Sequence, residues 1–359
     1  MHLIATCIAL ATLSAAHASL SPVDSKDIDG VVRGFAEKKL FNGNVLVVQK
    51  GKVIFQKCYG MANMEWNIPN QPDTKFRIGS VTKQFTAMLI MQLVQEGTLK
   101  LDSKITEYLP WYRKDTGDRI TLHHLLTHTA GIPNYTTPAA LLDIEYGAYT
   151  LQQVAEKYCS GELEFEPGTK FKYNNSDYYL LGLIIESVTK KPFSQVLQEK
   201  ILNVLGMRNS GMDTAYPLLK KRASGYVIVD GEYQNVSSLQ AADTVFAAGA
   251  MYSTVGDLAR WEHALFTNKL LTKESMDLLK KPFLGKYAYG LYVNKFTPPG
   301  ANTAVTAIGH NGGIRGFSAS TIHFVENDLT IILCDNTQVH TRGNIEDVTV
   351  GIYSVVVGK

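Results

Sequence analysis

The chain has 359 residues, of which 45% are hydrophobic and 19% are charged. This composition is typical of a globular protein with one large domain or two modest ones, and it excludes a disordered chain. The 35 Lys and Arg residues nearly balance the 33 Asp and Glu residues, which leaves a formal charge of +2. Because no basic run accompanies this small charge, we expect no nucleic-acid partner.

The N-terminal residues 1–18 (MHLIATCIALATLSAAHA) are typical of a secretory signal peptide. The apolar run 3–13 has the length of the hydrophobic region of such a peptide, and Ala-His-Ala at 16–18 has the small-x-small form of a cleavage site. No apolar stretch of 18 residues follows it, so we expect no transmembrane span in the mature chain. The sequence therefore predicts a secreted or periplasmic protein; a buried N-terminal helix is the alternative.

Strand and helix patterns begin soon after this segment. Residues 24–41 favour an amphipathic helix, and the β-branched runs 44–49 and 52–58 predict a hairpin. The Asn, Pro and Gly residues of 59–77 indicate a loop. The stretch 80–96 has apolar residues at helical spacing on a wide stripe, which predicts a helix buried on most sides.

The rest of the chain changes from helical to strand patterns. Residues 100–225 have helical patterns interrupted by Pro and Gly, whereas strand patterns prevail after about 225. Residues 316–325 and 328–334 predict a second hairpin, and the last 20 residues a closing helix. We therefore expect an α+β fold in residues 19–359. Its antiparallel sheet would come from the N- and C-terminal segments, flanked by helices, with an inserted helical subdomain at about 100–225.

Cysteine and histidine spacing gives no metal site. Three cysteines lie beyond the N-terminal segment (Cys58, Cys159 and Cys334), so one disulfide at most can form, and which residues pair stays open. His124 and His128 have the i, i+4 spacing of a zinc pair but lack the Glu of H-E-x-x-H. We expect neither a metal nor another cofactor.

The first chemical signal is Ser80-Val81-Thr82-Lys83. Positions i and i+3 share a helix face, so the hydroxyl and the amine can meet. A serine is a poor nucleophile until a base takes its proton, and a lysine acts as that base when its pKa is lowered. Burial at the start of a helix favours this, and the N–H of Ser80 could face a developing oxyanion. Alone, S-x-x-K is a weak motif, and the alternative is a solvated helix turn.

The second signal is Tyr173-Asn174-Asn175. A tyrosine near a lysine ammonium could have a lowered pKa and act as a base or proton shuttle. Asn175 could donate to a substrate carbonyl and accept from Lys83. The alternative is an aromatic core residue followed by a helix cap.

The third signal is His310-Asn311-Gly312-Gly313, which precedes the strand expected at 316–325. Glycines let a backbone approach a ligand closely, so the N–H of Gly313 could be a second oxyanion donor. His310 could hydrogen-bond the Tyr173 hydroxyl or a substrate anion. The alternative is a glycine-rich turn with a surface histidine.

These three motifs, in this order, resemble those of the serine β-lactamase and penicillin-binding-protein superfamily. The similarity favours the branch with class C β-lactamases, soluble D,D-peptidases, D-aminopeptidases and family VIII esterases. It runs from about residue 28 to 335 and includes four longer segments: FRIGSVTKQF (76–85), ITLHHLLTHTAGIP (120–133), FEPGTKFKYNNSDYYLLG (165–182) and AGAMYSTVGDLARW (248–261).

The resemblance implies a β-lactamase/transpeptidase-like fold and a set of roles. It implies that Ser80 is acylated, that Lys83 and Tyr173 share the proton transfers, and that Asn175 orients the substrate. The backbone N–H groups of Ser80 and Gly313 would form the oxyanion hole. The implied partner is a small-molecule or peptide substrate.

Four further residues could contact that substrate: His310, Gly312, Arg315 and Tyr135. His310 stands where class C β-lactamases have a lysine, and a histidine near its usual pKa attracts a carboxylate less strongly. Arg315, three residues after Gly312, could replace the lost charge, or it is a solvated arginine. Tyr135 follows Gly-Ile-Pro-Asn in a loop that rims the cleft in the family, or it is an exposed loop aromatic.

The sequence predicts a serine hydrolase that forms an acyl-enzyme on Ser80. The substrate stays open among a β-lactam, a D-Ala-type peptide and a small ester. A catalytically silent relative that acts as a binding or assembly module is the alternative, because fold does not dictate function.

Overall fold

The computed structural model describes residues 25–214, 218–236, 242–299, 302–339 and 344–358. The predicted signal peptide lies outside these residues and stays a prediction. Within the described ranges, no helix combines the length and the apolar character that a membrane span requires.

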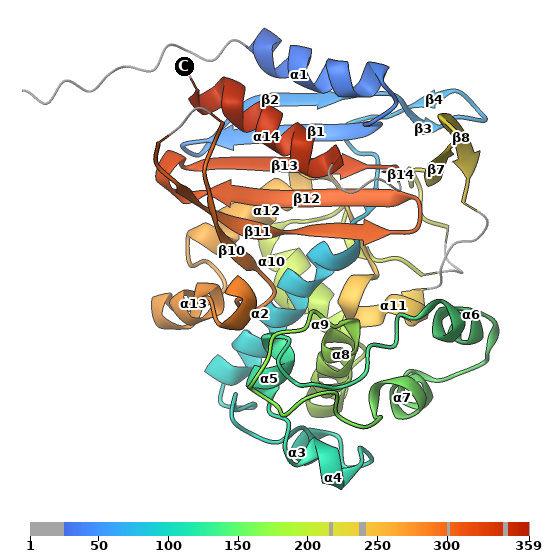
Figure 1. The fold of residues 1–359 in the computed structure, drawn as a ribbon, viewed down its shortest axis with the longest axis vertical. Helices are drawn as coiled ribbons and strands as arrows, with labels where there is room; N and C mark the ends of the chain where they lie inside the picture. Colours follow the sequence, from blue (N-terminus) through green and yellow to red (C-terminus); the bar gives the residue numbers. More distant parts are fainter. Residues whose placement is uncertain (1–24, 215–217, 237–241, 300–301, 340–343, 359) are drawn as a thin grey trace, which may run out of the picture.

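A six-stranded antiparallel sheet joins the two ends of the chain (Figure 1). Its order is β10-β11-β12-β13-β1-β2, so the N-terminal β1 pairs with the C-terminal β13, in a register that places Gly43 opposite Asp335. The strands are β1 (Gly43–Gln49), β2 (Lys52–Cys58), β10 (Tyr292–Phe296), β11 (Val305–Ile314), β12 (Phe317–Phe324) and β13 (Leu329–Asp335). This arrangement confirms the α+β fold and both expected hairpins.

Shorter strands form small sheets beside the main one. β5 and β6 pair with β9, β3 pairs with β4, and β7 pairs with β8 and β14. Their bounds are β3 (Met61–Asn63), β4 (Ile68–Pro69), β5 (Phe76–Arg77), β6 (Gly211–Met212), β7 (Tyr226–Val229), β8 (Glu232–Asn235), β9 (Met251–Ser253) and β14 (Thr337–Val339). The expectation of a loop at 59–77 is therefore wrong in part, because this segment contains three short strands. Two of them, β3 and β4, pair with each other, and β5 pairs with the distant β9.

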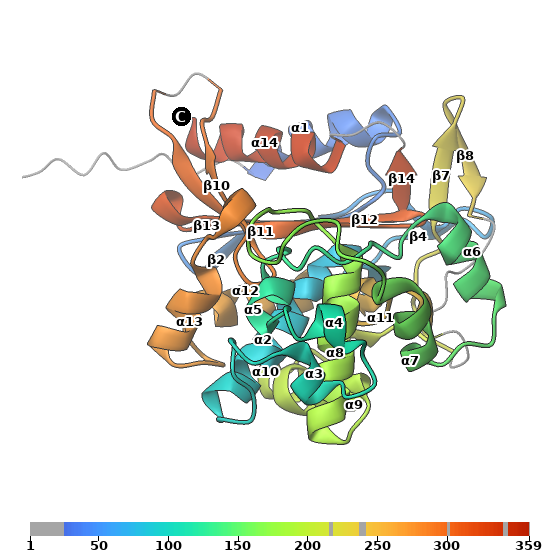
Figure 2. The same ribbon diagram turned by 60° about the horizontal axis from the view of Figure 1, so that its bottom comes forward.

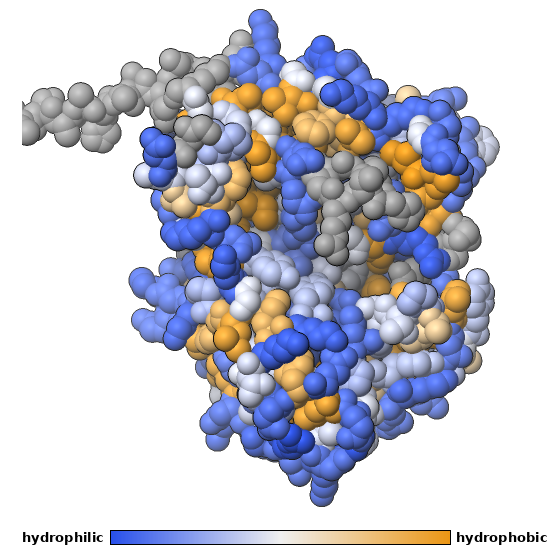
Figure 3. Space-filling model, in the orientation of Figure 1, coloured by the Kyte–Doolittle hydropathy of each residue, from blue (hydrophilic) through white to orange (hydrophobic). Residues whose placement is uncertain are grey.

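Helices cover both faces of the main sheet (Figure 2). The terminal helices α1 (Ser25–Glu37) and α14 (Asn344–Val357) pack on one face, where Ile28 and Val32 of α1 join a core with Val348 and Ile352 of α14. Figure 3 shows the surface of the molecule in the same orientation as Figure 1, and hydrophilic residues cover much of it, with apolar residues between them. Both terminal helices match the sequence prediction.

The opposite face carries the other helices around α2 (Thr82–Gln95), which the 3-10 turn η1 (Gly79–Val81) precedes. Twelve consecutive residues of α2 are buried, as its wide apolar stripe predicts. The 100–225 region contains α3 (Ile105–Tyr108), α4 (Lys114–Gly117), α5 (Leu122–Leu126), α6 (Pro138–Tyr146), α7 (Leu151–Val154), η2 (Ala155–Cys159), α8 (Asn175–Thr189), α9 (Phe193–Leu197), η3 (Gln198–Leu202) and α10 (Asn203–Leu205).

The expectation of strands after residue 225 is wrong in part. Three helices lie between the two groups of C-terminal strands: α11 (Ala242–Gly249), α12 (Val255–Phe266) and α13 (Lys273–Lys280). Thr254 and Thr272 cap α12 and α13 by accepting the N–H of Asp257 and Ser275, respectively. The thiols of Cys58, Cys159 and Cys334 are all free.

Candidate active site

Ser80 lies in the turn η1 between β5 and α2. The turn is held on both sides: Ile78 N–H donates to the Met251 carbonyl at 3.0 Å, and Arg77 forms a buried ion pair with Asp213. Gly79 has a φ of +50°, a conformation that glycine adopts without strain. The local fold therefore places the Ser80 hydroxyl at the start of a buried helix.

The amine of Lys83 lies one helical turn further, fully buried. Its Nζ donates to Ser80 Oγ at 3.0 Å, to Asn175 Oδ1 at 2.8 Å and to the Ala248 carbonyl at 2.9 Å. Burial lowers the pKa of Lys83 from 10.5 to about 7, and the negative charge of Asp177 opposes this shift. Near neutral pH a large share of the molecules therefore has a neutral amine beside the serine hydroxyl.

Tyr173 approaches Ser80 from the other side. Its hydroxyl donates to Ser80 Oγ at 2.8 Å, and its ring lies 4.9 Å from Lys83 Nζ. Burial raises the pKa of Tyr173, although the hydrogen bond to Ser80 opposes the shift. The expectation of a lowered pKa is therefore wrong, because desolvation of the phenolate is the largest effect on this group. Tyr173 stays protonated near neutral pH and is suited to donate a proton.

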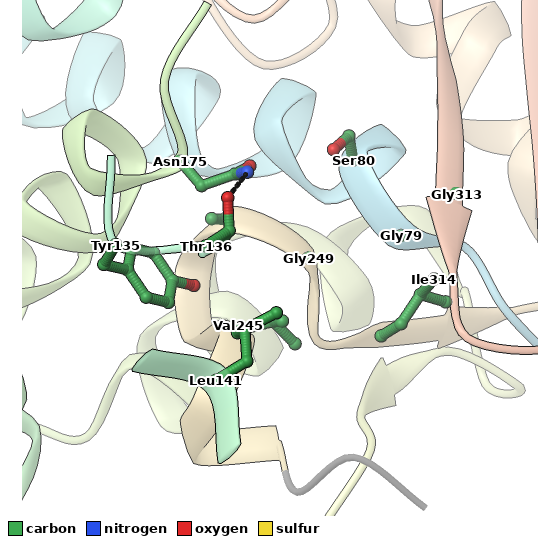
Figure 4. Close-up of a pocket in the computed structure, with 11 residues that line it drawn as sticks. Gly79, Ser80, Tyr135, Thr136, Leu141, Asn175, Val245, Gly249, Gly313 and Ile314 are labelled. Atoms are coloured by element: carbon green, nitrogen blue, oxygen red, sulfur yellow. Dashed lines mark hydrogen bonds between the residues drawn. The ribbon is translucent and has the colours of Figure 1, made fainter. Parts of the chain in front are cut away.

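Asn175 starts helix α8 and joins the same cluster. Its Oδ1 accepts from Lys83, as expected, and its Nδ2 donates to Thr136 Oγ1 at 3.1 Å (Figure 4). Thr136 and the carbonyl of Ala248 were not singled out in the sequence. Ala248 lies in one of the segments that carry the family resemblance, but a backbone acceptor leaves no residue-type signal.

The glycines of the third motif lie inside strand β11, not in a turn. A Cβ at Gly312 would stand 1.9 Å from the Ile78 carbonyl oxygen, and one at Gly79 would stand 2.9 Å from the Gly313 nitrogen. The strand thus approaches η1 at a distance that only glycine allows. A Cβ at Gly313 would have no atom within 4 Å, so this residue borders open space beside Ser80.

His310 is buried beside Tyr173. Its Nε2 is 3.1 Å from the Tyr287 hydroxyl, and its ring centroid is 6.0 Å from that of Tyr173. Burial, and then the charge of Lys83, lower the pKa of His310 to about 3. The side chain is therefore neutral. Its hydrogen-bond partners are the Tyr287 hydroxyl at Nε2 and the Asn311 carbonyl oxygen at Nδ1, instead of the expected Tyr173. The alternative of a surface histidine is wrong.

A pocket of about 180 Å³ opens beside Ser80 (Figure 4). Four of the predicted residues line it: Ser80, Tyr135, Asn175 and Gly313. The ring of Tyr135 is buried, which rules out an exposed loop aromatic. Its hydroxyl has no hydrogen-bond partner among the described residues. The other lining residues are Gly79, Thr136, Leu141, Val245, Ala248, Gly249 and Ile314.

Arg315 forms an ion pair and is not simply a solvated arginine. Its Nη1 lies 3.7 Å from Glu145 Oε2 on α6. The charge that could have replaced a lysine is therefore balanced by a carboxylate. The sequence could not identify this partner, because 170 residues separate the two positions.

His124 and His128, which have the spacing of a zinc pair, do not form a metal site with other described residues. His128 is buried, and its Nδ1 lies 2.8 Å from Asp177 Oδ2. The ring of His128 also packs 4.5 Å from that of Tyr173. His124 instead caps the turn before α5 through Thr121. Among the residues described, no cluster of His, Cys, Asp and Glu has the geometry to hold a metal ion.

The fold and this Ser–Lys–Tyr cluster define a class of protein, and the comparisons agree. A family model described as Beta-lactamase matches residues 26–350, so the chain belongs to the beta-lactamase family.

Curated relatives and solved structures lie within the same superfamily. Protein flp from Staphylococcus aureus (strain MW2) is 30% identical over 240 residues, which are 66% of this chain and 48% of that protein. The teichoic acid D-alanine hydrolase of Staphylococcus aureus is 26% identical, over 87% of this chain and 73% of its own length. The crystal structure of a penicillin-binding protein from Bacillus halodurans has a TM-score of 0.78 at 27% identity. The match covers 90% of this chain and 98% of that one.

Proposed function

We propose that the protein is a serine hydrolase that forms an acyl-enzyme on Ser80 and cleaves an ester or amide of a small acyl group. The observation that carries this proposal is the pair of contacts at Ser80 Oγ. Lys83 Nζ lies at 3.0 Å and the Tyr173 hydroxyl at 2.8 Å. A nucleophile with a base and a proton donor in reach is the arrangement that acyl transfer needs.

The proton transfers follow from the two pKa shifts. As Ser80 Oγ attacks the substrate carbonyl, its proton passes to the neutral amine of Lys83. The N–H groups of Ser80 and Gly313 hold the resulting oxyanion. When the carbonyl re-forms, the bond to the leaving group breaks, and that group takes a proton from Lys83 through the Tyr173 hydroxyl. Water then attacks the acyl carbonyl and gives a proton to the neutral amine of Lys83. As the bond between the acyl carbon and Ser80 Oγ breaks, that proton passes to Ser80 Oγ and the carboxylic acid leaves.

The charges around the site favour a small ester or a D-alanyl compound over a β-lactam. A β-lactam carries a carboxylate, but His310 is neutral and Arg315 is paired with Glu145. The pocket is small, and Tyr135, which lines it, has a buried hydroxyl with no hydrogen-bond partner among the described residues. That hydroxyl could accept a hydrogen bond from the amino group of an alanyl substrate. The name of the teichoic acid D-alanine hydrolase agrees with this class.

The proposal is tested by comparing three substrates with wild type and Ser80→Ala. We expect wild type to hydrolyse p-nitrophenyl butyrate and a D-alanyl ester faster than a chromogenic cephalosporin, and Ser80→Ala to lose ester turnover. Thermal unfolding of both proteins controls for folding. Unchanged turnover in Ser80→Ala would refute the mechanism, and fast cephalosporin turnover would refute the substrate class.

A further inference from the structure

The pocket beside Ser80 is narrowed by apolar side chains from three elements. Leu141 comes from α6, Val245 from α11 and Ile314 from the end of β11. Figure 4 shows the three side chains gathered on the side of the pocket away from Asn175. An acyl chain that extends from Ser80 would meet this apolar group.

Next to these side chains, an ion pair links α6 to Arg315, the residue that follows β11. Glu145 lies four residues after Leu141, so both share one face of α6. Arg315 directly follows Ile314, and its Nη1 lies 3.7 Å from Glu145 Oε2. The Glu145 side chain is only 10% exposed, which places this contact against packed protein on at least one side.

We propose that the Glu145–Arg315 ion pair closes the far end of this pocket and so sets the maximum length of the acyl group. The inference rests on the proposed function and specifies its substrate class: esters and amides of short acyl groups. Leu141 and Ile314 provide the apolar walls, and beyond them the ion pair holds α6 against the turn that follows β11.

The size of the pocket gives the expected limit. An apolar cavity of about 150 Å³ accommodates a benzene molecule, so one of this size holds roughly six or seven nonhydrogen atoms. The pocket measures about 180 Å³. Acetyl, alanyl and butyryl groups fit within this limit, hexanoyl reaches it, and octanoyl exceeds it.

The test measures kcat/KM for p-nitrophenyl acetate, butyrate, hexanoate and octanoate. We expect wild type to show a drop of about tenfold or more from butyrate to octanoate, in line with the usual effect of pocket size. Glu145→Ala and Arg315→Ala should each raise the octanoate-to-butyrate ratio by about tenfold. Glu145→Gln, which keeps the size but removes the charge, should raise it less, and added salt should raise it in wild type because salt screens the ion pair.

Glu199→Ala is the matched control. Glu199 also forms an ion pair, with Lys191 at 2.7 Å, but it lies on η3, which contributes no residue to the pocket. Its octanoate-to-butyrate ratio should equal that of wild type. An unchanged ratio in Glu145→Ala and Arg315→Ala, with normal thermal unfolding, would overturn the inference.

A binding measurement separates failure of this inference from failure of the proposed function. Saturation-transfer NMR of butanamide and octanamide needs no nucleophile, so it can use Ser80→Ala. If no ester is hydrolysed, the proposed function falls. In that case we still expect Ser80→Ala to bind butanamide better than octanamide. The double variant Ser80→Ala/Glu145→Ala should bind the two amides equally well. If Ser80→Ala and the double variant each bind butanamide and octanamide equally well, the inference is overturned.

Discussion

The two walls of the cleft contribute to the site in different ways. On the sheet side, β11 brings backbone atoms to Ser80, and Gly312 and Gly313 are suited to this because they lack side chains. On the helical side, Tyr173 and Asn175 bring polar side-chain atoms to Ser80 and Lys83. The contribution of the sheet wall therefore depends on the absence of side chains at Gly312 and Gly313. The contribution of the helical wall depends on the polar groups of Tyr173 and Asn175. Substitutions on the two sides should fail for different reasons.

Removing the Tyr173 hydroxyl should have the largest effect on the helical side. Tyr173→Phe keeps the ring packed against His128 but deletes the donor to Ser80 Oγ. Loss of a positioned proton donor lowers rates by about 10²–10⁴-fold. We expect kcat for p-nitrophenyl butyrate to fall by this factor while the unfolding temperature stays within a few degrees. A fall below tenfold would show that Tyr173 has no part in proton transfer.

The pH dependence of kcat/KM should report Lys83. The amine acts as a base only when neutral, and its pKa is about 7. Activity should therefore rise with pH, about tenfold per pH unit below 7 and to a plateau above it. His310, with a pKa of about 3, keeps one charge state over pH 5–8. His310→Gln should therefore show the same rise of kcat/KM with pH. A profile that is flat from pH 5 to 8 would contradict the assignment.

Adding one methyl group should distinguish the neighbouring glycines of the sheet wall. In Gly312→Ala the Cβ meets the Ile78 carbonyl oxygen, and we expect a loss of about 1–3 kcal/mol in the free energy of unfolding from overpacking. Gly313→Ala meets no atom within 4 Å, so its stability should match wild type. Urea denaturation measures both. Equal stabilities would show that β11 does not press against the turn of Ser80.

The smallest expected effect concerns Tyr135. Tyr135→Phe keeps the buried ring but removes the hydroxyl, which has no partner among the described residues. If the hydroxyl binds the amino group of an alanyl substrate, the variant should lose about 1 kcal/mol, or roughly fivefold in kcat/KM, for a D-alanyl ester. Turnover of the butyryl ester, which has no amino group, serves as the control. A parallel loss for both esters would exclude this role.

Local patterns were sufficient to predict much of this arrangement. Ser80 and Lys83 share a helical turn, so their proximity could be predicted from spacing alone, and runs rich in β-branched residues identified the strands of the N-terminal hairpin. What depends on packing could not be predicted this way. The sign of the Tyr173 pKa shift was wrong because burial is a property of the assembled core.

Contacts between distant segments were also beyond a single sequence. The ion pair of Arg315 with Glu145 and the acceptor role of the Ala248 carbonyl join residues far apart in the chain. The alternative of a glycine-rich turn after His310 is wrong, because these glycines lie inside β11, where the strand passes close to the turn of Ser80. Helices α11–α13 were missed among the strand patterns after residue 225.

The central claim is that Ser80 carries the acyl group, and peptide mapping tests it most directly. Wild type is treated with a fluorophosphonate, digested with trypsin and analysed by mass spectrometry. Cleavage after Arg77 and Lys83 releases the peptide Ile78–Lys83, which contains Ser80. We expect the added mass on Ser80 of this peptide and no labelling in Ser80→Ala. Labelling of a different residue, or no adduct in a folded protein that hydrolyses the ester, would contradict it.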